Sequence, residues 1–405
     1  MGEVNRNLLF LYCVALLQCI SLESCGQRNK NKSVAATESK SVSIETGAAQ
    51  TDLYIPFLKG KRVALMVNQT STIHQTHLLD TLLALKINVV KIFAPEHGFR
   101  GHAEAGEVFS NEIDKKTNLP IVSLYGKNKK PGKEILKDID VVVFDIQDVG
   151  ARFFTYISSM HYLMQGCAEN DKELLILDRP NPHGNYIDGP LLEPKFKSFI
   201  GMHTIPIIHG LTIGELAGMI NGENWLDSNK VCKVKVIKVK NYTHKTHYIP
   251  PIRPSPNLPD SQSVKLYPSL CFFEGTSISL GRGTTFPFKV IGAPDKIYGN
   301  YVFVPRSIEG MAKNPLHEGV ECYGLELSLA ETKPGLNLSY LINFYALTPD
   351  KNKFFIPFFN TVAGNATLQQ QIKDGWSESK IKASWKSDLE NFQKKRKSYL
   401  LYEDF

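Results

Sequence analysis

A carboxylate and an imidazole stand side by side at the end of an apolar segment. Residues 94–98 read Ala-Pro-Glu-His-Gly, and the run before them, residues 89–93, predicts a buried β-strand that the proline and the glycine end. In open α/β sheets, ligands bind outside the carboxyl ends of the strands. The position of Glu96 and His97 therefore indicates an enzyme that acts on a polar substrate.

Two further apolar runs also end in acidic residues. Residues 141–144 are followed by Asp145 and Asp148, and residues 174–177 are followed by Asp178. A doubly wound sheet brings strand ends together although they are distant in sequence. We expect these carboxylates to share one rim with the first pair.

The segment 145–156 adds an amide, Arg152 and Tyr156 to its two acids. Such groups suit hydroxyl-rich or acylated sugars, whose orientation is fixed by hydrogen bonds, but a structural ion-pair network has the same composition. Arg179, two residues before Asn181, can hold a carboxylate with two parallel hydrogen bonds. His209 follows an apolar run and, taken alone, favours a structural role.

The elements that must position these residues alternate between strand and helix. Strands are expected at residues 62–67, 89–93, 121–125, 141–144 and 174–177, with helices at 77–85, 133–137 and 154–169. The pair Thr212 and Glu215 has capping-box spacing and opens a helix that runs to residue 220. The fold class is α/β, a Rossmann-like and mostly parallel sheet with right-handed crossovers.

The length of 405 residues favours two domains. We expect a Rossmann-like catalytic domain at residues 51–255 and a smaller α+β domain at 256–405, whose helices lie near 361–372 and 384–396. The proline-rich run 249–259 is either a loop that lines the substrate or a linker between the domains.

The composition excludes several classes of protein. The net charge of +7 is a mild excess without a dense basic stripe, so nucleic acid is not an expected partner. There is no Walker A pattern and no GxGxxG after the first strand, which argues against a nucleotide cofactor. No HExxH or cysteine–histidine metal pattern and no GxSxG nucleophile motif occurs either, and we expect neither a metal nor an organic cofactor.

The amino terminus is expected to be a signal peptide, residues 1–25, followed by a flexible tether at 26–50. Its apolar core, residues 8–20, is too short to span a bilayer comfortably. Residues 22–26, Leu-Glu-Ser-Cys-Gly, are similar to a bacterial lipobox, although its Glu is unusual. A lipid anchor on Cys25, in the periplasm or at the outer membrane, is the favoured interpretation, and plain secretion is the alternative.

Four cysteines remain beyond the amino-terminal segment, Cys167, Cys232, Cys271 and Cys322. They are widely spaced, so free buried thiols are the simpler expectation, although a periplasmic location would permit disulfides.

Seven ordered motifs together resemble the NamZ-type exo-β-N-acetylmuramidases. They lie at residues 94–101, 145–156, 177–182, 189–192, 209–212, 254–259 and 267–276, and the resemblance runs from about residue 60 to the carboxyl terminus. It implies an active site in the cleft between a Rossmann-like and a smaller domain, and release of N-acetylmuramic acid from the non-reducing end of peptidoglycan fragments.

The same resemblance implies that Glu96 is the catalytic residue, and its carboxyl group is the candidate acid. Glycosidic cleavage needs an acid for the leaving oxygen and usually a second carboxylate. His97 can position the acid, and Asp145 and Asp148 are candidates for base, nucleophile or stabiliser, unless the acetamido group of the substrate replaces an enzyme nucleophile. The candidate substrate-binding residues are Asn68, Arg152, Tyr156, Asp178, Arg179, Asn181, His209, Asn257, Glu274 and Arg282.

The lactyl carboxylate distinguishes muramic acid from glucosamine. Arg152, Arg179 and Arg282 are its candidate partners, and the expected ligands are muropeptides or disaccharides derived from peptidoglycan. Two rival functions stay open at this point. One is an amidase or esterase of the cell wall, and the other is a non-catalytic lipoprotein that binds muropeptides.

Overall fold

A computed structural model describes residues 43–99 and 112–405, which belong to one compact unit. The predicted signal peptide, the lipobox with Cys25 and most of the tether lie outside the described residues. The last part of the predicted tether, residues 43–50, is not a tether. It forms the short helix η1 (Gly47–Ala49) against the sheet edge, where the Gly47 N–H donates to the Asp178 carbonyl at 2.8 Å.

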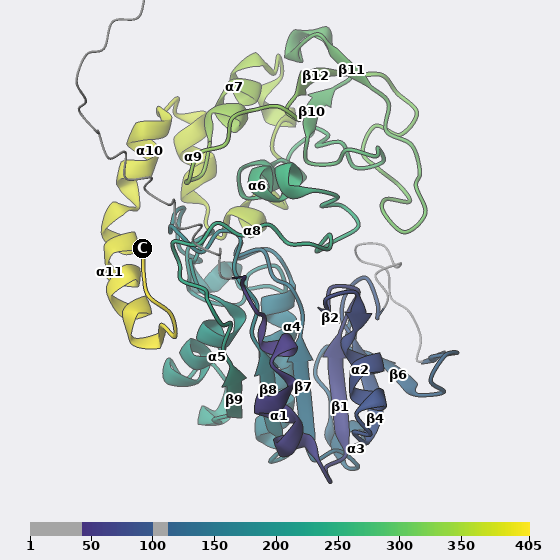
Figure 1. Cartoon of the computed structure of the whole chain (residues 1–405). Coiled ribbons are helices and arrows are strands. Elements are labelled where there is room, and N and C mark those ends of the chain that lie inside the picture. Colours follow the sequence, from purple (N-terminus) through teal and green to yellow (C-terminus); the bar gives the residue numbers. More distant parts are fainter. Residues whose placement is uncertain (1–42, 100–111) are drawn as a thin grey trace, which may run out of the picture. The chain divides into compact units, whose positions relative to one another are not determined.

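The larger sheet has seven strands in the order β5-β6-β4-β1-β7-β8-β9 (Figure 1). All its pairings are parallel except that of β5 with β6. The strands are β1 (Val63–Val67), β4 (Val89–Ala94), β5 (Glu112–Ile113), β6 (Pro120–Ser123), β7 (Val141–Asp145), β8 (Glu173–Leu177) and β9 (Lys233–Ile237). Without the edge strand β5, this is the Rossmann order 3-2-1-4-5-6, which reverses at the β1–β7 pair.

Both faces of the sheet are covered, so β1 and β7 are buried throughout, and all their residues are apolar except Asp145 at the end of β7. Alternate residues of β1 enter two separate cores. One core contains α1 (Thr51–Leu58) and α2 (Leu78–Ala84), and the other contains α4 (Tyr156–Glu169) and α5 (Ile213–Gly222). The expected capping box of α5 is present, with the Thr212 and Glu215 side chains each accepting from the other residue's backbone N–H.

The carboxyl-terminal part adds a three-stranded antiparallel sheet in the order β10-β12-β11 (Figure 1). Its strands are β10 (Val290–Ala293), β11 (Tyr301–Phe303) and β12 (Cys322–Glu326), and its helices are α6 (Ser261–Leu270), α7 (Ser339–Leu347), α8 (Phe359–Ala363), α9 (Thr367–Lys373), α10 (Glu378–Ser384) and α11 (Lys386–Arg396). The α+β character is confirmed. Side chains of this part share one continuous core with α4 and α5.

The helix predicted at residues 361–372 is two helices, α8 and α9. Gly364 separates them in the left-handed conformation at φ 76°, which favours glycine. The sequence prediction also missed α6 and α7. Pro268 lies inside α6, and the aromatic and β-branched residues of α7 have modest helix propensity.

The last residues of the chain return to the larger sheet. The Tyr402 hydroxyl donates to Asp178 Oδ2 at 2.6 Å, and the Leu401 N–H donates to Glu215 Oε1 at 2.9 Å. Part of the segment predicted as a separate domain thus packs on the parallel sheet. No helix within residues 43–99 and 112–405 is both long and apolar enough to cross a membrane.

Candidate functional site

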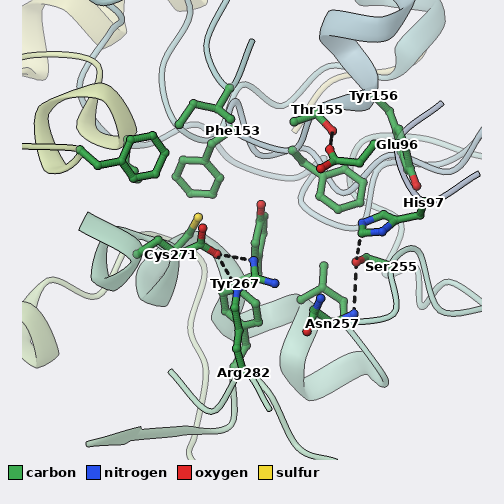
Figure 2. A pocket seen from close by; sticks show the side chains of 17 residues that line it. Glu96, His97, Phe153, Thr155, Tyr156, Ser255, Asn257, Tyr267, Cys271 and Arg282 are labelled. Atoms are coloured by element: carbon green, nitrogen blue, oxygen red, sulfur yellow. Dashed lines mark hydrogen bonds and ion pairs between the residues drawn. The ribbon is translucent and has the colours of Figure 1, made fainter. Parts of the chain in front are cut away.

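A cavity of about 130 Å³ opens beyond the carboxyl end of β4, between side chains of the larger sheet and of the carboxyl-terminal part (Figure 2). Its lining consists of Glu96, His97, Phe153, Phe154, Thr155, Tyr156, Ile200, Ser255, Asn257, Leu258, Tyr267, Cys271, Glu274, Arg282, Phe288, Phe358 and Val362. Apolar walls with a few converging polar groups are typical of small-molecule sites.

A tight turn carries Glu96 into this cavity. The Gly98 N–H donates to the Pro95 carbonyl at 3.0 Å and closes the turn directly after β4. His97 has a φ of 69°, in a region that residues with a Cβ seldom adopt. Such strain persists where surrounding contacts hold it, most often at functional sites. The strain of His97 thus accompanies the placement of Glu96.

Two hydroxyl groups hold the Glu96 carboxylate. Tyr125 Oη donates to Oε1 at 2.9 Å, and Thr155 Oγ1 donates to Oε2 at 2.5 Å. Glu96 is only 8% exposed, so these contacts fix the direction of the carboxyl group in a largely dry environment. A hydroxyl can donate to a carboxylate and accept from a carboxylic acid, so the arrangement serves a group that gains and loses a proton.

His97 faces the proline-rich segment on the other side of the cavity mouth. Its Nε2 lies 3.3 Å from Ser255 Oγ, which also accepts from the Asn257 N–H at 3.2 Å (Figure 2). Asn257 donates from Nδ2 to the Met311 carbonyl at 2.9 Å. The run 249–259 is therefore a loop that lines the cavity, one of the two alternatives its composition allowed.

An ion pair lies on the opposite side of the cavity from Glu96 (Figure 2). Arg282 donates from Nε and Nη2 to Glu274 Oε1, at 3.2 and 2.5 Å. The two side chains are 28% and 26% exposed, and the guanidinium lies 5.4 Å from the centroid of the Phe288 ring. In these hydrogen bonds Arg282 uses one edge of its planar group, so Nη1 is left for an anionic ligand.

Behind the Glu96 side of the cavity lies a buried polar cluster, in which the Asn68 side chain is a hydrogen-bond partner of the Tyr156 hydroxyl and Asp148 Oδ1 has no hydrogen-bond partner. Burial, followed by the charge of Glu96, raises the pKa of Tyr156, and Asp148 adds to this effect. Tyr156 is therefore close to both carboxylates. Buried orphan groups are costly, so this cluster is suited to a polar ligand or an ordered water.

Burial raises the pKa of Asp148 to about 7, although its carboxylate accepts from the backbone of Gly150 at 2.6 Å. A carboxyl group with that pKa can be either protonated or ionised near neutral pH. This is the property expected of a proton-transfer residue or of a neutral hydrogen-bond donor.

The structure places six of the predicted residues on the cavity wall, Glu96, His97, Tyr156, Asn257, Glu274 and Arg282. Asn68 and Asp148 lie one layer behind, next to Tyr156. The remaining six predicted residues lie elsewhere, and each has a structural explanation.

Asp145 and Arg179 form a buried ion pair with each other. Arg179 donates from Nε and Nη2 to the two Asp145 oxygens at 2.5 and 2.9 Å, and the two side chains are 4% and 0% exposed. Adjacent strands, β7 and β8, bring them together at the expected rim. Because they neutralise each other there, neither lines the cavity.

Arg152 is also buried away from the cavity surface. Its Nη1 donates to the carbonyls of Pro190 and Ile205 at 2.8 and 3.0 Å, and its Nη2 donates to that of Ala363 at 2.6 Å. The guanidinium therefore holds backbone segments together in this structure, in place of the predicted contact with a substrate carboxylate.

Asp178, Asn181 and His209 lie in the core that supports the rim. Asp178 accepts from Thr212 and Tyr402, the Asn181 amide donates to the Leu211 carbonyl, and His209 Nδ1 accepts from the Leu211 N–H. All three are at most 3% exposed. None of them borders the cavity.

The sequence reasoning missed Tyr125, Thr155 and Ser255. Thr155 and Ser255 lie inside motifs that were singled out, but hydroxyl side chains follow no diagnostic spacing. Tyr125 ends the predicted strand 121–125, so its place at a strand end was the one available signal. Cys271 also lines the cavity, and burial raises the pKa of its thiol well above the usual range.

The described residues contain no group of three or more His, Cys, Asp or Glu side chains that could hold a metal ion. Cys167, Cys232, Cys271 and Cys322 are all buried and unbridged. The polar groups of the cavity are thus suited to acid–base chemistry and hydrogen bonding on an uncharged or anionic organic ligand.

Family models match most of the chain. "Exo-beta-N-acetylmuramidase NamZ, N-terminal" matches residues 63–262, and the corresponding C-terminal model matches residues 265–402. The chain is 36% identical to the peptidoglycan beta-N-acetylmuramidase NamZ of Bacillus subtilis (strain 168), over 98% of this chain and 100% of the relative.

Two crystal structures of DUF1343 family proteins from Bacteroides fragilis NCTC 9343 have the same fold. One superimposes with a TM-score of 0.82 at 49% identity and covers 90% of this chain and 100% of its own. The other has a TM-score of 0.75 at 31% identity and covers 89% of this chain and 99% of its own.

We predict that Asp148 makes the stability of the fold fall between about pH 4 and pH 7. Its pKa is about 7 in the folded state against 3.8 for the free side chain. As the pH rises through this window, the unfolded chain releases the proton first. Each pH unit then costs the folded state roughly 1.4 kcal/mol, until the folded pKa is passed. Asp148→Asn removes this slope.

Urea denaturation of the wild type and of Asp148→Asn from pH 4 to pH 8 measures the difference. Asp140→Asn is the matched control. Hydrogen bonds from Arg62 lower the pKa of the Asp140 carboxyl to about 2. Its effect on stability therefore changes with pH below about pH 4, outside the measured window. Parallel stability profiles for the wild type and Asp148→Asn would contradict the assignment.

Proposed function

The chain belongs to the NamZ family of exo-β-N-acetylmuramidases, and we propose that its cavity at Glu96 hydrolyses the terminal N-acetylmuramic acid from the non-reducing end of peptidoglycan fragments. One observation carries this assignment. Glu96 lies directly after a parallel strand, on the wall of a cavity and opposite an arginine that can bind an anionic sugar substituent. The comparisons give no support to an amidase, an esterase or a non-catalytic receptor.

In this mechanism, Glu96 is the general acid. Its proton passes to the glycosidic oxygen while the bond from that oxygen to C1 breaks, and the sugar becomes oxocarbenium-like. The hydroxyls of Tyr125 and Thr155 keep the carboxyl group in one orientation and stabilise its ionised form after the transfer. His97 is assigned a positioning role, since its backbone forms the strained turn and its Nε2 lies 3.3 Å from Ser255 Oγ.

Besides the acid Glu96, the proposed mechanism uses Tyr156 and the buried cluster behind it. Tyr156 lines the cavity, and its buried hydroxyl has Asp148 and Asn68 as its neighbours. A protonated Asp148 supports a Tyr156 that donates to the acetamido oxygen of the sugar, whereas an ionised Asp148 polarises the same hydroxyl as an acceptor for the acetamido N–H. Either arrangement directs the acetamido group toward the anomeric carbon C1. This group or a water molecule then attacks C1 and completes the displacement of the leaving sugar.

Arg282 is the proposed partner of the lactyl carboxylate. Among the three arginines considered from the sequence, it alone lines the cavity, since Arg152 and Arg179 are occupied elsewhere. Its Nη1 edge can donate to the substrate while Glu274 keeps the Nε edge in place. The sugar then spans the cavity, with its lactyl group at Arg282 and its C1 at Glu96.

The lipobox at residues 22–26 supports a lipid anchor on Cys25 in a bacterial protein of the periplasm or the outer membrane. An anchored exo-hydrolase would act on fragments released from the wall close to the membrane. This proposal is independent of the catalytic one.

For catalysis, we predict that Glu96→Gln lowers turnover of an N-acetylmuramyl–N-acetylglucosamine disaccharide by about a hundredfold or more. The amide keeps the size of the side chain but has no proton to transfer. Product release measured by chromatography gives turnover, and product affinity should stay within a few-fold of the wild type. Glu134→Gln, at a side chain that is 80% exposed, serves as the control. Turnover within a few-fold of the wild type would exclude Glu96 as the acid.

For specificity, we predict that Arg282→Met reduces the preference for 4-nitrophenyl N-acetylmuramide over the corresponding N-acetylglucosaminide by about tenfold or more. Loss of a charge-assisted contact to the lactyl carboxylate affects only the muramide. Glu274→Gln breaks the same ion pair, leaves the cation and removes a charge that repels the lactyl carboxylate, so it should keep or increase the preference. Equal ratios of kcat/KM in the wild type and both variants would show that another group recognises the carboxylate.

For localisation, we predict that Cys25→Ser moves the protein from the membrane fraction to the soluble fraction of the cell. Acyl chains would supply the anchoring, and serine cannot carry them through a thioether. Immunoblots of separated fractions measure the distribution, with Cys19→Ser as the control inside the same segment. An unchanged distribution of Cys25→Ser would refute the anchor and leave the catalytic assignment intact.

A further inference from the structure

We propose that the rings of Tyr125 and Phe199, which lie beside Glu96 but do not line the cavity that holds Arg282, form a subsite for the leaving sugar. This inference rests on the proposed function, because it divides the substrate at the bond that Glu96 cleaves. It adds a binding site for the N-acetylglucosamine ring that departs with the glycosidic oxygen.

Phe199 stands at the tip of a short hairpin. Ser198 and Gly201 exchange two backbone hydrogen bonds, at 2.8 and 3.1 Å, and leave Phe199 and Ile200 as the two tip residues. Ile200 lines the cavity, while the Phe199 ring lies 5.6 Å from the Tyr125 ring in an edge-to-face contact. One tip residue thus lines the cavity, and the other contacts the Tyr125 ring.

The aromatic group extends outward from the acid. Tyr125 binds Glu96 Oε1 through its hydroxyl at 2.9 Å, so its ring begins next to the carboxyl group. Beyond Phe199, the Tyr162 ring follows at 6.3 Å in a stacked arrangement, and Lys129 Nζ lies 5.2 Å from the centroid of Phe199. Tyr125, Phe199 and Tyr162 are all half-buried, so part of each ring is accessible.

The position of the acid decides which part of the substrate meets these rings. A general acid must contact the glycosidic oxygen, which joins the two sugars. A sugar bound with its lactyl group at Arg282 fills the cavity on one side of that oxygen. The departing ring therefore lies outside that part of the cavity, and Tyr125, which binds Glu96 without lining the cavity, is the aromatic residue placed to meet it.

The chemistry of the rings fits a pyranose. One face of a β-linked N-acetylglucosamine presents axial C–H bonds, which pack on aromatic faces and edges, while its hydroxyls stay in water. A half-buried aromatic group beside a polar catalytic residue can bind such a ring without burying its hydroxyls. Because the contact is apolar and weakly directional, it contributes binding energy to the leaving sugar rather than to the bond-breaking step.

The experiment compares two substrates that differ only in the leaving group. One is the N-acetylmuramyl–N-acetylglucosamine disaccharide, and the other is β-N-acetylmuramyl fluoride, whose leaving group has no ring. We expect Phe199→Ala to lower kcat/KM for the disaccharide about tenfold, mainly through KM, and to change that for the fluoride less than twofold. Phe199→Tyr, which keeps a ring, should have a kcat/KM for the disaccharide close to that of the wild type, and Phe199→Leu should not.

Phe196→Ala is the matched control, because Phe196 lies three residues earlier, contacts Lys195 and does not line the cavity. This variant should have the wild-type kcat/KM for both substrates. An unchanged disaccharide rate in Phe199→Ala, or an equal loss on both substrates, would overturn the subsite while leaving the muramidase assignment standing. A wild-type protein that releases N-acetylmuramic acid from neither substrate would instead overturn the proposed function and the subsite with it.

Discussion

One buried cation holds the walls of the cavity at Glu96 together. Arg152 is 1% exposed and donates to the carbonyls of Pro190, Ile205 and Ala363. Within the described chain it has no carboxylate partner, and burial lowers its pKa to about 9, so it is still charged at neutral pH. A lone buried charge is costly, and here oriented carbonyl dipoles offset that cost. Those carbonyls come from segments that are far apart in the sequence.

Each of the segments that Arg152 joins carries part of the cavity. The residues directly after it, Phe153 to Tyr156, form one wall, and the stretch between Pro190 and Ile205 includes the hairpin tip. The carbonyl of Val362, a further lining residue, lies 3.4 Å from Nη2. At Gly364 a Cβ would lie 2.4 Å from Nη2, so only glycine lets the backbone approach this closely. The shape of the cavity thus depends on a residue that does not touch it.

The sequence predicted the larger sheet and the place of Glu96 at its edge because both follow from local patterns. Apolar strands buried on two faces are continuous runs, and a polar residue after such a run must lie at the sheet edge. The pattern could not separate Glu96 from Asp145, since both follow strands. What separates them is the chain beside each one. Arg179, just after β8, pairs with Asp145, whereas Tyr125, just after β6, and Thr155, just before α4, donate hydroxyl hydrogen bonds to Glu96. Such pairings depend on strand order and on side-chain geometry across the sheet, which a single sequence does not encode locally.

The ion pair of Glu274 and Arg282 determines how strongly the site can prefer a sugar with a carboxylate. An arginine without a partner would make a sugar that lacks a carboxylate strongly unfavourable, because the cation would stay buried and unpaired. In this site, Glu274 keeps Arg282 paired at 2.5 Å when a glucosaminide binds, so that penalty is absent. Discrimination must then come from the gain at Nη1 when the lactyl group is present, reduced by the repulsion between the lactyl carboxylate and Glu274. The ion pair therefore limits the selectivity for muramides over glucosaminides. In return, it keeps the guanidinium paired when no lactyl carboxylate is bound.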